Sequence, residues 1–218
     1  MRKSLLAALK EIIPQAPVFT TAAAAKAAGV SRDVASRDLG VAAAAGLIVR
    51  MKPGVWAVSA HPDFSPYVAV PFLVGGEQFS GLGYVSLPSA LALRGMIQQL
   101  PGSVHVMVLA QRRALETPVA RFEFHKLDAA VFGGFTDFGS RFSFPLATPA
   151  KALFDTLLLS VSRGRRFSYL PELRFTRAFS RREMEHWIAR IRSSRLRSAV
   201  GNRWAIVRER ESIERERE

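Results

Sequence analysis

The chain has 218 residues, of which 49% are hydrophobic, and its formal net charge is +13 at pH 7. This length and composition can fill the cores of two small domains or one large one. Because the chain has no cysteine, disulfides and thiolate metal sites are excluded, and we expect a cytoplasmic protein. No apolar run approaches the ~20 residues that a membrane span needs, and the basic start lacks a cleavage signal, so neither membrane contact nor a signal peptide is expected.

The charge is distributed unevenly along the chain. Residues 1–60 carry 8 Lys or Arg against 3 Asp or Glu, a net charge of +5, and residues 61–159 carry 7 of each. Residues 160–218 carry 16 basic and 8 acidic residues, a net charge of +8. A polyanion is the simplest partner for both basic ends, whereas a solvated surface that favours solubility is the alternative for the C-terminal charge.

The first 46 residues have the signals of three helices. Leucines and isoleucines at helical spacing predict an amphipathic helix over residues 3–13. Thr20 or Thr21 can cap a short alanine-rich helix, and Gly29 supplies the positive φ that ends it. Ser31 is expected to cap the next helix, which stops at Gly46. The inner side of that helix is predicted to consist of Val34, Leu39, Val41 and Ala42.

A hairpin is predicted after this helix. Two short apolar runs are joined by the turn sequence Lys52-Pro53-Gly54, and Trp56 on the second run is expected to lie in the core. Two helices joined by a tight glycine turn and followed by a hairpin have the order of a winged helix-turn-helix. The alternative is a small helical domain with solvated charges that does not bind DNA.

In a winged helix-turn-helix, the N-terminal residues of the second helix reach base edges and the hairpin meets phosphates. We therefore predict a double-stranded DNA site made of Thr20, Thr21, Ser31, Arg32, Ser36, Arg37, Arg50 and Lys52.

The proline-rich segment at residues 61–66 is the expected domain boundary. Tyr67 to Val74 is predicted as a helix or a strand. Further on, we expect a helix that begins at the Ser86 cap and ends at Gly95, strands over 103–110 and 121–127, and more strands within 131–144.

The last third of the chain is expected to be mainly helical. One helix is predicted to begin at Thr148 as cap with Pro149 in its first position, and others cover 180–192 and 195–207. Residues 208–218 alternate Arg and Glu and are expected to be a disordered tail. The predicted fold is α+β: a winged helix-turn-helix over 1–60, then a mixed α/β domain over 61–207 with a helical C-terminus.

Four segments in this order resemble the AbiEi-type antitoxins of bacterial type IV toxin–antitoxin systems. The first is the predicted helix-turn-helix with its Lys-Pro-Gly-Val-Trp hairpin, and the second is the run from Tyr84 to Leu91 followed by Arg94-Gly95-Met96-Ile97. The third is the series from Arg112 to His125, and the fourth is Ala147-Thr148-Pro149-Ala150-Lys151-Ala152-Leu153-Phe154-Asp155. The similarity spans roughly residues 15–160.

The resemblance implies a two-domain transcriptional repressor that binds an inverted repeat in its own promoter. It also implies that the C-terminal domain helps repression and counteracts a nucleotidyltransferase-like toxin. We expect no cofactor. A stand-alone DNA-binding regulator without a toxin partner is the alternative. A second basic surface, for DNA or for a partner, is predicted from Arg112, Arg113, Arg163, Arg165, Arg166, Arg174 and Arg177.

Enzymatic function is not expected. The four histidines lie far apart in the sequence, and none has metal-ligand spacing to another histidine. A nuclease is the closest enzymatic alternative because Glu123, His125 and Lys126 lie on one predicted strand. Lys151 and Asp155 are four residues apart on a predicted helix, which is more often a surface pair than a site. We therefore predict neither a catalytic nor a metal site.

Overall fold

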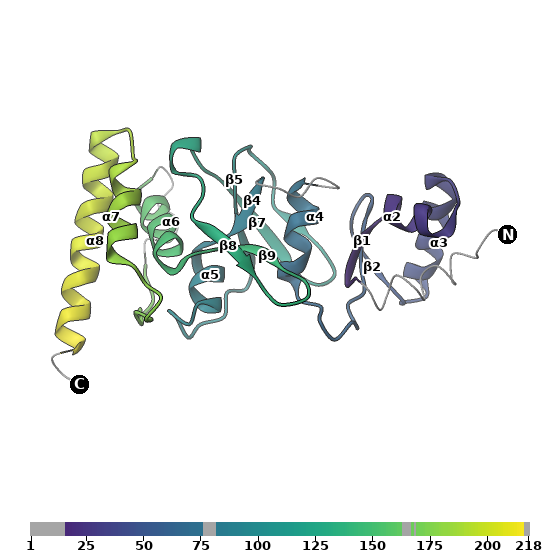
Figure 1. The fold of residues 1–218 in the computed structure, drawn as a ribbon, viewed down its shortest axis with the longest axis horizontal. Coiled ribbons are helices and arrows are strands. Elements are labelled where there is room, and N and C mark those ends of the chain that lie inside the picture. The colour runs from purple at the N-terminus through teal and green to yellow at the C-terminus, as the bar shows by residue number, and fades with distance from the viewer. Residues whose placement is uncertain (1–15, 76–81, 163–166, 168, 216–218) are drawn as a thin grey trace. The chain divides into compact units, whose positions relative to one another are not determined.

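The computed structural model describes residues 16–75, 82–162, 167 and 169–215 (Figure 1). These residues form seven α-helices and two sheets, so the fold is mixed α+β. Of the described residues, one compact unit contains those up to 84 with 113–123 and 137–145, and the other contains 85–112, 124–136 and those from 146 onward. The helix expected over residues 3–13 lies outside the described residues.

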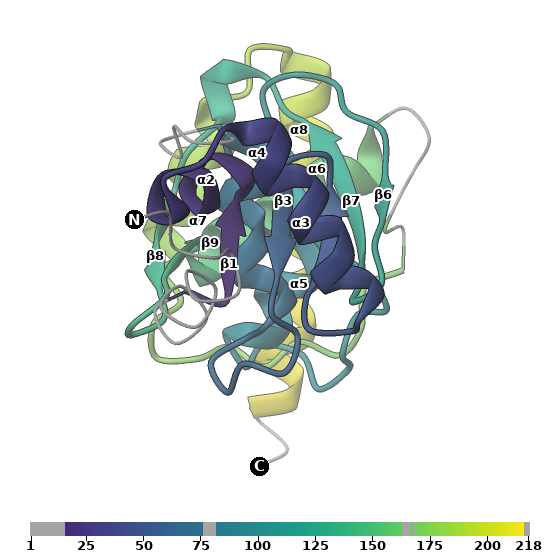
Figure 2. The same ribbon diagram turned by 90° about the vertical axis from the view of Figure 1, so that its right-hand side faces the viewer.

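The first unit begins with two helices and a small antiparallel sheet; Figure 2 labels α2, α3 and the strands β1 and β3. The order is β1 (Val18–Thr20), α2 (Thr21–Ala28), α3 (Arg32–Ala44), β2 (Val49–Lys52) and β3 (Val55–Ala57). β3 lies between β1 and β2 in the sheet. The hairpin turn at Gly54, which has a φ of 80°, was predicted from the sequence, whereas strand β1 was not.

The ends of α2 and α3 follow the sequence signals. Gly29 and Gly46 have left-handed φ values of 66° and 74°. At each end, the backbone N–H of the residue after the glycine donates to a carbonyl five residues earlier, which satisfies a helix terminus. Ser31 caps α3 as predicted, because its hydroxyl accepts a hydrogen bond from the N–H of Val34.

The core beneath α3 differs in part from the prediction. Leu39 and Ala42 are buried as expected, and Ala35 lies with them at helical spacing. The predictions for Val34 and Val41 were wrong, because these side chains are 37% and 67% exposed. Each is next in sequence to a buried residue, and successive residues of a helix are rotated by ~100°, so both side chains point away from the buried stripe. The core also contains Phe19, Ala24, Ala25, Ala28, Ile48, Trp56 and Val58.

The segment after residue 65 is helical, which resolves the open choice between helix and strand. A 3-10 helix η1 (Pro66–Ala69) leads directly into α4 (Val70–Gly75). Val70, Leu73 and Val74 are buried. Pro71 is tolerated because it lies in the first turn, where backbone N–H groups have no intrahelical acceptor anyway.

The larger sheet has six strands in the order β6-β7-β5-β4-β9-β8. The strands are β4 (Gly83–Val85), β5 (Val104–Val108), β6 (Leu115–Glu116), β7 (Arg121–Lys126), β8 (Phe135–Phe138) and β9 (Phe144–Ala147). β4 and β9 are parallel, with Val85 opposite Leu146, whereas β6 and β7 are antiparallel. A short 3-10 helix, η2 (Ala129–Val131), follows β7.

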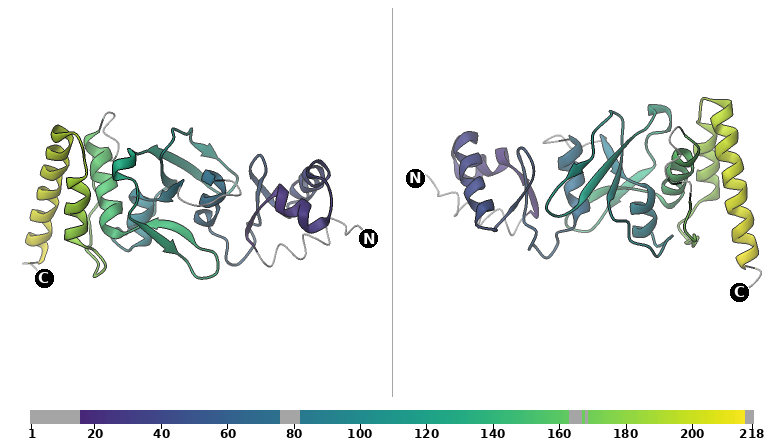
Figure 3. Two further views of the ribbon diagram at one scale, coloured as in Figure 1. Left: turned by 45° about the horizontal axis from the view of Figure 1, so that its top comes forward. Right: turned by 180° about the vertical axis from the view of Figure 1, so that it is seen from behind.

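Four helices belong to the second unit: α5 (Leu87–Leu93), α6 (Pro149–Val161), α7 (Arg181–Ala189) and α8 (Ser194–Arg215). Helices α6, α7 and α8 pack side by side, as Figure 3 shows from two directions. Because neighbours cover α6, eleven of its thirteen residues are buried. Thr148 caps α6 as predicted, and its hydroxyl accepts from the N–H of Lys151 at 3.1 Å.

The C-terminal helix extends further than the sequence indicated. Disorder was expected from residue 208, but α8 continues to Arg215. Glu211 is 7% exposed and accepts a hydrogen bond at 2.9 Å from Arg181 on α7, so this part of α8 is held by tertiary contacts. Among the described residues, no helix combines the length and the apolar character required for a membrane span.

Candidate functional site

The outer face of α3 carries the side chains predicted to bind DNA. Arg32, Ser36 and Arg37 are exposed, and Ser31 is exposed at the cap position. They lie on the first two turns of the helix: Arg32 and Ser36 flank the buried stripe of Ala35 and Leu39, and Arg37 lies across the helix from it. Asp33 and Asp38 lie on the same helix, so the charges of its two arginines are balanced. This face can offer two guanidinium forks and a hydroxyl to a partner.

The two threonines predicted to bind DNA have structural contacts. Thr20 is only 8% exposed, and its hydroxyl accepts from the N–H of Ala23 at 3.1 Å as the cap of α2. The Thr21 hydroxyl accepts from the indole N–H of Trp56 at 2.8 Å. Trp56 is 3% exposed, which confirms its predicted place in the core. These contacts tie Thr20 to α2 and Thr21 to Trp56 of β3, and Thr21 is half-buried.

The two basic residues of the β2–β3 hairpin differ in their surroundings. Arg50 is exposed, and its guanidinium lies 5.6 Å from the ring centroid of Trp56. Lys52 is half-buried, and its Nζ donates to the backbone carbonyl of Leu73 on α4 at 2.9 Å. Lys52 thus ties the hairpin to the end of α4, whereas Arg50 has an exposed cationic head.

The second basic surface predicted from the sequence is only partly described. Arg163, Arg165 and Arg166 lie outside the described residues. Arg113, Arg174 and Arg177 are exposed and Arg112 is half-buried. Arg174 and Arg177 belong to the segment between α6 and α7, where the N–H of Arg174 donates to the carbonyl of Met96 at 2.8 Å.

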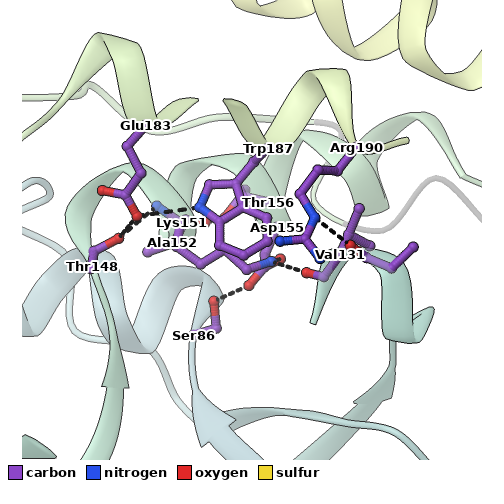
Figure 4. Close-up of polar contacts among 11 residues, drawn as sticks. Ser86, Val131, Thr148, Lys151, Ala152, Asp155, Thr156, Glu183, Trp187 and Arg190 are labelled. Carbon is purple, nitrogen blue, oxygen red and sulfur yellow. Dashed lines mark hydrogen bonds and ion pairs between the residues drawn. The ribbon is translucent and has the colours of Figure 1, made fainter. Parts of the chain in front are cut away.

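The prediction that Lys151 and Asp155 form a surface pair was wrong. Both side chains are completely buried, and Lys151 Nζ lies 2.5 Å from Asp155 Oδ1 (Figure 4). Lys151 also donates to the carbonyl of Val131 at 2.7 Å, and Asp155 Oδ2 accepts from the Ser86 hydroxyl at 2.7 Å. Ser86 occupies the cap position of α5 without a side-chain capping bond, and its hydroxyl donates to Asp155.

Aromatic rings cover this lysine. Lys151 Nζ lies 4.6 Å from the ring centroids of both Phe154 and Trp187, which suits a cation because each ring face is electronegative. The Trp187 indole N–H donates to Glu183 at 3.2 Å, and Glu183 accepts from the Thr148 hydroxyl at 2.6 Å (Figure 4). These contacts connect α7 to the N-terminus of α6. We call Ser86, Lys151, Asp155 and Trp187 the Lys151 cluster.

Burial lowers the pKa of Lys151 below its ordinary value, while the Asp155 carboxylate acts in the opposite direction. A buried amine of this kind can be catalytic where substrate reaches it. Here neither Lys151 nor Asp155 has any exposed surface, and each charged group has several partners. The cluster is therefore suited to hold α5, α6, α7 and η2 together.

A histidine pair was missed by the sequence reasoning. His105 on β5 and His125 on β7 are 8% and 4% exposed, and their Nδ1 and Nε2 atoms are 3.1 Å apart. The Phe167 ring packs edge-on against both imidazoles, with centroids 5.2 and 5.7 Å away. Since β5 and β7 are neighbours in the sheet, residues far apart in sequence meet there. The two imidazoles share a hydrogen bond, and imidazole nitrogens are common metal ligands.

No protein-family model and no curated protein matches the chain.

Proposed function

We propose that this protein is a DNA-binding transcriptional repressor and the antitoxin of a type IV toxin–antitoxin system. The observation that carries the DNA-binding part is the exposure of Arg32, Ser36 and Arg37 on the first turns of α3. A recognition helix contacts base edges with its N-terminal residues. An arginine guanidinium can donate two hydrogen bonds to guanine, and a serine hydroxyl can form a hydrogen bond with any base or with a phosphate.

The arrangement of the neighbouring elements supports a winged helix-turn-helix. The order β1, α2, α3, β2, β3, with a glycine turn between the helices and a hairpin after them, is that of the motif. In this proposal α3 is the recognition helix and the β2–β3 hairpin is the wing. Arg50 then contacts phosphate, since its guanidinium is exposed on the wing.

The charge balance of α3 bears on the kind of binding. Asp33 and Asp38 offset Arg32 and Arg37, so this helix alone attracts the phosphate backbone weakly. We therefore expect modest affinity for random DNA and a clear preference for one site, which is the behaviour of a repressor. Symmetric dimers on inverted repeats are the common arrangement for such motifs.

The antitoxin part of the proposal is supported by the four sequence segments that resemble AbiEi-type proteins. Three of these segments contain buried residues of the second unit, including Ser86, His125, Lys151 and Asp155. A stand-alone regulator without a toxin remains the second candidate. Co-expression separates them: if a neighbouring nucleotidyltransferase-like gene arrests growth, the proposal requires that this protein restores growth, and a failure to do so leaves only the regulator.

DNA binding is tested with the full chain and a fluorescent duplex from the region upstream of its gene, in competition with a shuffled duplex. We expect at least about tenfold preference for the upstream duplex, because repressors exceed their own non-specific affinity by far more. Equal affinity for both duplexes would exclude a specific repressor.

Incubation of the duplex with the protein and Mg²⁺ tests the nuclease alternative. Cleavage of the DNA that is abolished in the Glu123→Ala variant would favour a nuclease over our proposal.

A further inference from the structure

The second unit contains a cavity of about 300 Å³, lined by the end of β7, η2, the C-terminal half of α6, the turn between α7 and α8, and the start of α8. This volume corresponds to roughly ten water molecules of the liquid. It also lies at the lower end of the range of about 300–1,000 Å³ for small-molecule sites. None of the residues predicted to bind DNA through α3 or the hairpin lines it.

The lining of the cavity is apolar toward the core. Leu127, Val131, Leu158 and Ile191 are each at most 5% exposed and contribute to the lining. A ligand whose hydrocarbon part contacts these side chains would gain about 25 cal/mol of binding free energy for each Å² of apolar surface removed from water. The inner part of the cavity therefore favours an apolar group.

The outer part of the cavity is cationic. Lys126, Arg190 and Arg192 line it and are exposed, against a single carboxylate, Asp128. That carboxylate accepts from the N–H of Ala130 at 2.7 Å, so it already has a backbone partner. Three cations around one partnered carboxylate favour an anionic group at the entrance.

The Arg190 side chain is fixed by two contacts although it is exposed to solvent. Its Nε donates to the carbonyl of Ala130 at 2.7 Å, and its guanidinium lies 5.1 Å from the ring centroid of Trp187. Figure 4 shows this arginine beside Trp187, with its Nε directed toward the η2 backbone. A positioned guanidinium loses little side-chain entropy when it binds an anion.

We propose that this cavity binds a small organic anion whose apolar body contacts Leu127, Val131 and Leu158 and whose acidic group contacts Lys126, Arg190 and Arg192. The ligand belongs to the class of medium-chain or aromatic carboxylates. It would contact two residues that the Lys151 cluster holds, Arg190 through Trp187 and Val131 through Lys151. This binding does not depend on the proposed DNA-binding or antitoxin function.

The experiment is isothermal titration of the full-length protein with octanoate, which has ten non-hydrogen atoms, and with acetate and octylammonium at neutral pH. We expect one octanoate per chain, with acetate and octylammonium each bound at least about tenfold more weakly. Loss of one charge-assisted contact weakens binding by about tenfold or more, so Arg192→Glu should have that effect. Arg182→Glu, an exposed charge reversal on α7 outside the cavity, should leave the affinity within about twofold.

A second variant tests the apolar part. Leu159 is half-buried and lines the cavity, so Leu159→Trp should occupy the space and abolish octanoate binding while the thermal unfolding remains cooperative. Lys126→Glu replaces Arg192→Glu should the latter fail to fold. No heat of binding in about 10 mM octanoate, or equal binding of octanoate and octylammonium, would overturn the proposal. An unchanged affinity in Arg192→Glu and in Lys126→Glu would overturn it as well.

Discussion

Lys151 and Asp155 face each other across one turn of α6, with Nζ and Oδ1 2.5 Å apart and neither side chain exposed. On an isolated helix such a pair would contribute only about 0.2–0.5 kcal/mol. In the folded protein both charges are removed from water. The ion pair and its hydrogen bonds to Ser86 and Val131 must together offset the cost of this desolvation.

Removal of one member of this pair should destabilise the protein strongly. Lys151→Met leaves the Asp155 carboxylate buried with the Ser86 hydroxyl, and we expect a loss of about 3–5 kcal/mol in the free energy of unfolding. The double variant Lys151→Met/Asp155→Leu should lose less than the sum of the single variants. Urea denaturation measures these values, with Lys126→Met as the exposed control. A single-variant loss below about 1 kcal/mol would contradict this prediction.

The stability of the protein should increase with pH in the alkaline range through Lys151. Its pKa in the folded protein is lowered by burial, whereas in the unfolded chain it has the ordinary value of 10.5. Between these two pKa values the unfolded chain binds more protons, so the free energy of unfolding rises with pH toward 10.5. The difference in stability between the wild type and Lys151→Met should therefore grow over this window. A difference that shrinks with pH would mean that the Asp155 carboxylate raises the pKa of Lys151 more than burial lowers it.

Gly134→Ala should destabilise the region around Trp187. Gly134 has a φ of 71°, and a Cβ atom there would lie 2.6 Å from Trp187 Cζ2 and 3.0 Å from Lys151 Cγ. We expect a loss of about 1–3 kcal/mol, from backbone strain and overpacking together. Gly40 on α3 is the matched control, since nothing lies within 4 Å of its Cβ position. Gly40→Ala should stabilise by about 0.5–1 kcal/mol, as expected for a helix interior.

Arg32 and Arg37 should determine DNA sequence preference. Arg32→Ala or Arg37→Ala should each cost about 1–3 kcal/mol on the upstream duplex and less on a shuffled duplex, because base contacts carry the sequence information. Fluorescence anisotropy with both duplexes measures this. Arg182→Ala removes the same charge from α7 and should change neither affinity much. An equal loss on both duplexes would assign these arginines to phosphate contacts.

Arg50 and Lys52 should differ although they are two residues apart. Arg50→Ala should weaken binding to every duplex and lower the slope of log affinity against log salt by about 1. Lys52→Ala should instead lower the free energy of unfolding by about 1–3 kcal/mol, because it leaves the carbonyl of Leu73 without its charged donor. Salt titrations and thermal melts of both variants separate the two roles, and a reversed pattern would contradict the assignment.

Much of the local structure of the first unit could be predicted because short-range chemistry determines it. Gly29, Ser31, Gly46 and the Pro53-Gly54 turn act on neighbours within five residues, and the structure contains each helix end and turn as expected. Strand β1 was not predicted. Its three residues are a strand because β3 supplies the partner, and a sequence window does not contain that partner.

Side-chain environments were harder to predict than elements. Val34 and Val41 are apolar yet exposed, while the smaller Ala35 is buried, because helix orientation and not hydrophobicity decides which stripe meets the core. Lys52 was predicted to contact phosphate, and in the structure its amine donates to the Leu73 carbonyl, 21 positions along the chain. In both cases the deciding neighbour lies on another element.

The sequence by itself determined the α+β composition, the capped helices, the hairpin, the separate basic ends and the exposed arginines of α3 as candidates for DNA. Only the tertiary structure decided that Lys151 and Asp155 are buried and that His105 and His125 touch. It also decided that Lys126, Arg190 and Arg192 border one cavity. The physical reason is that caps and turns depend on contacts within a few residues, whereas burial and charge pairing depend on which distant segments pack together.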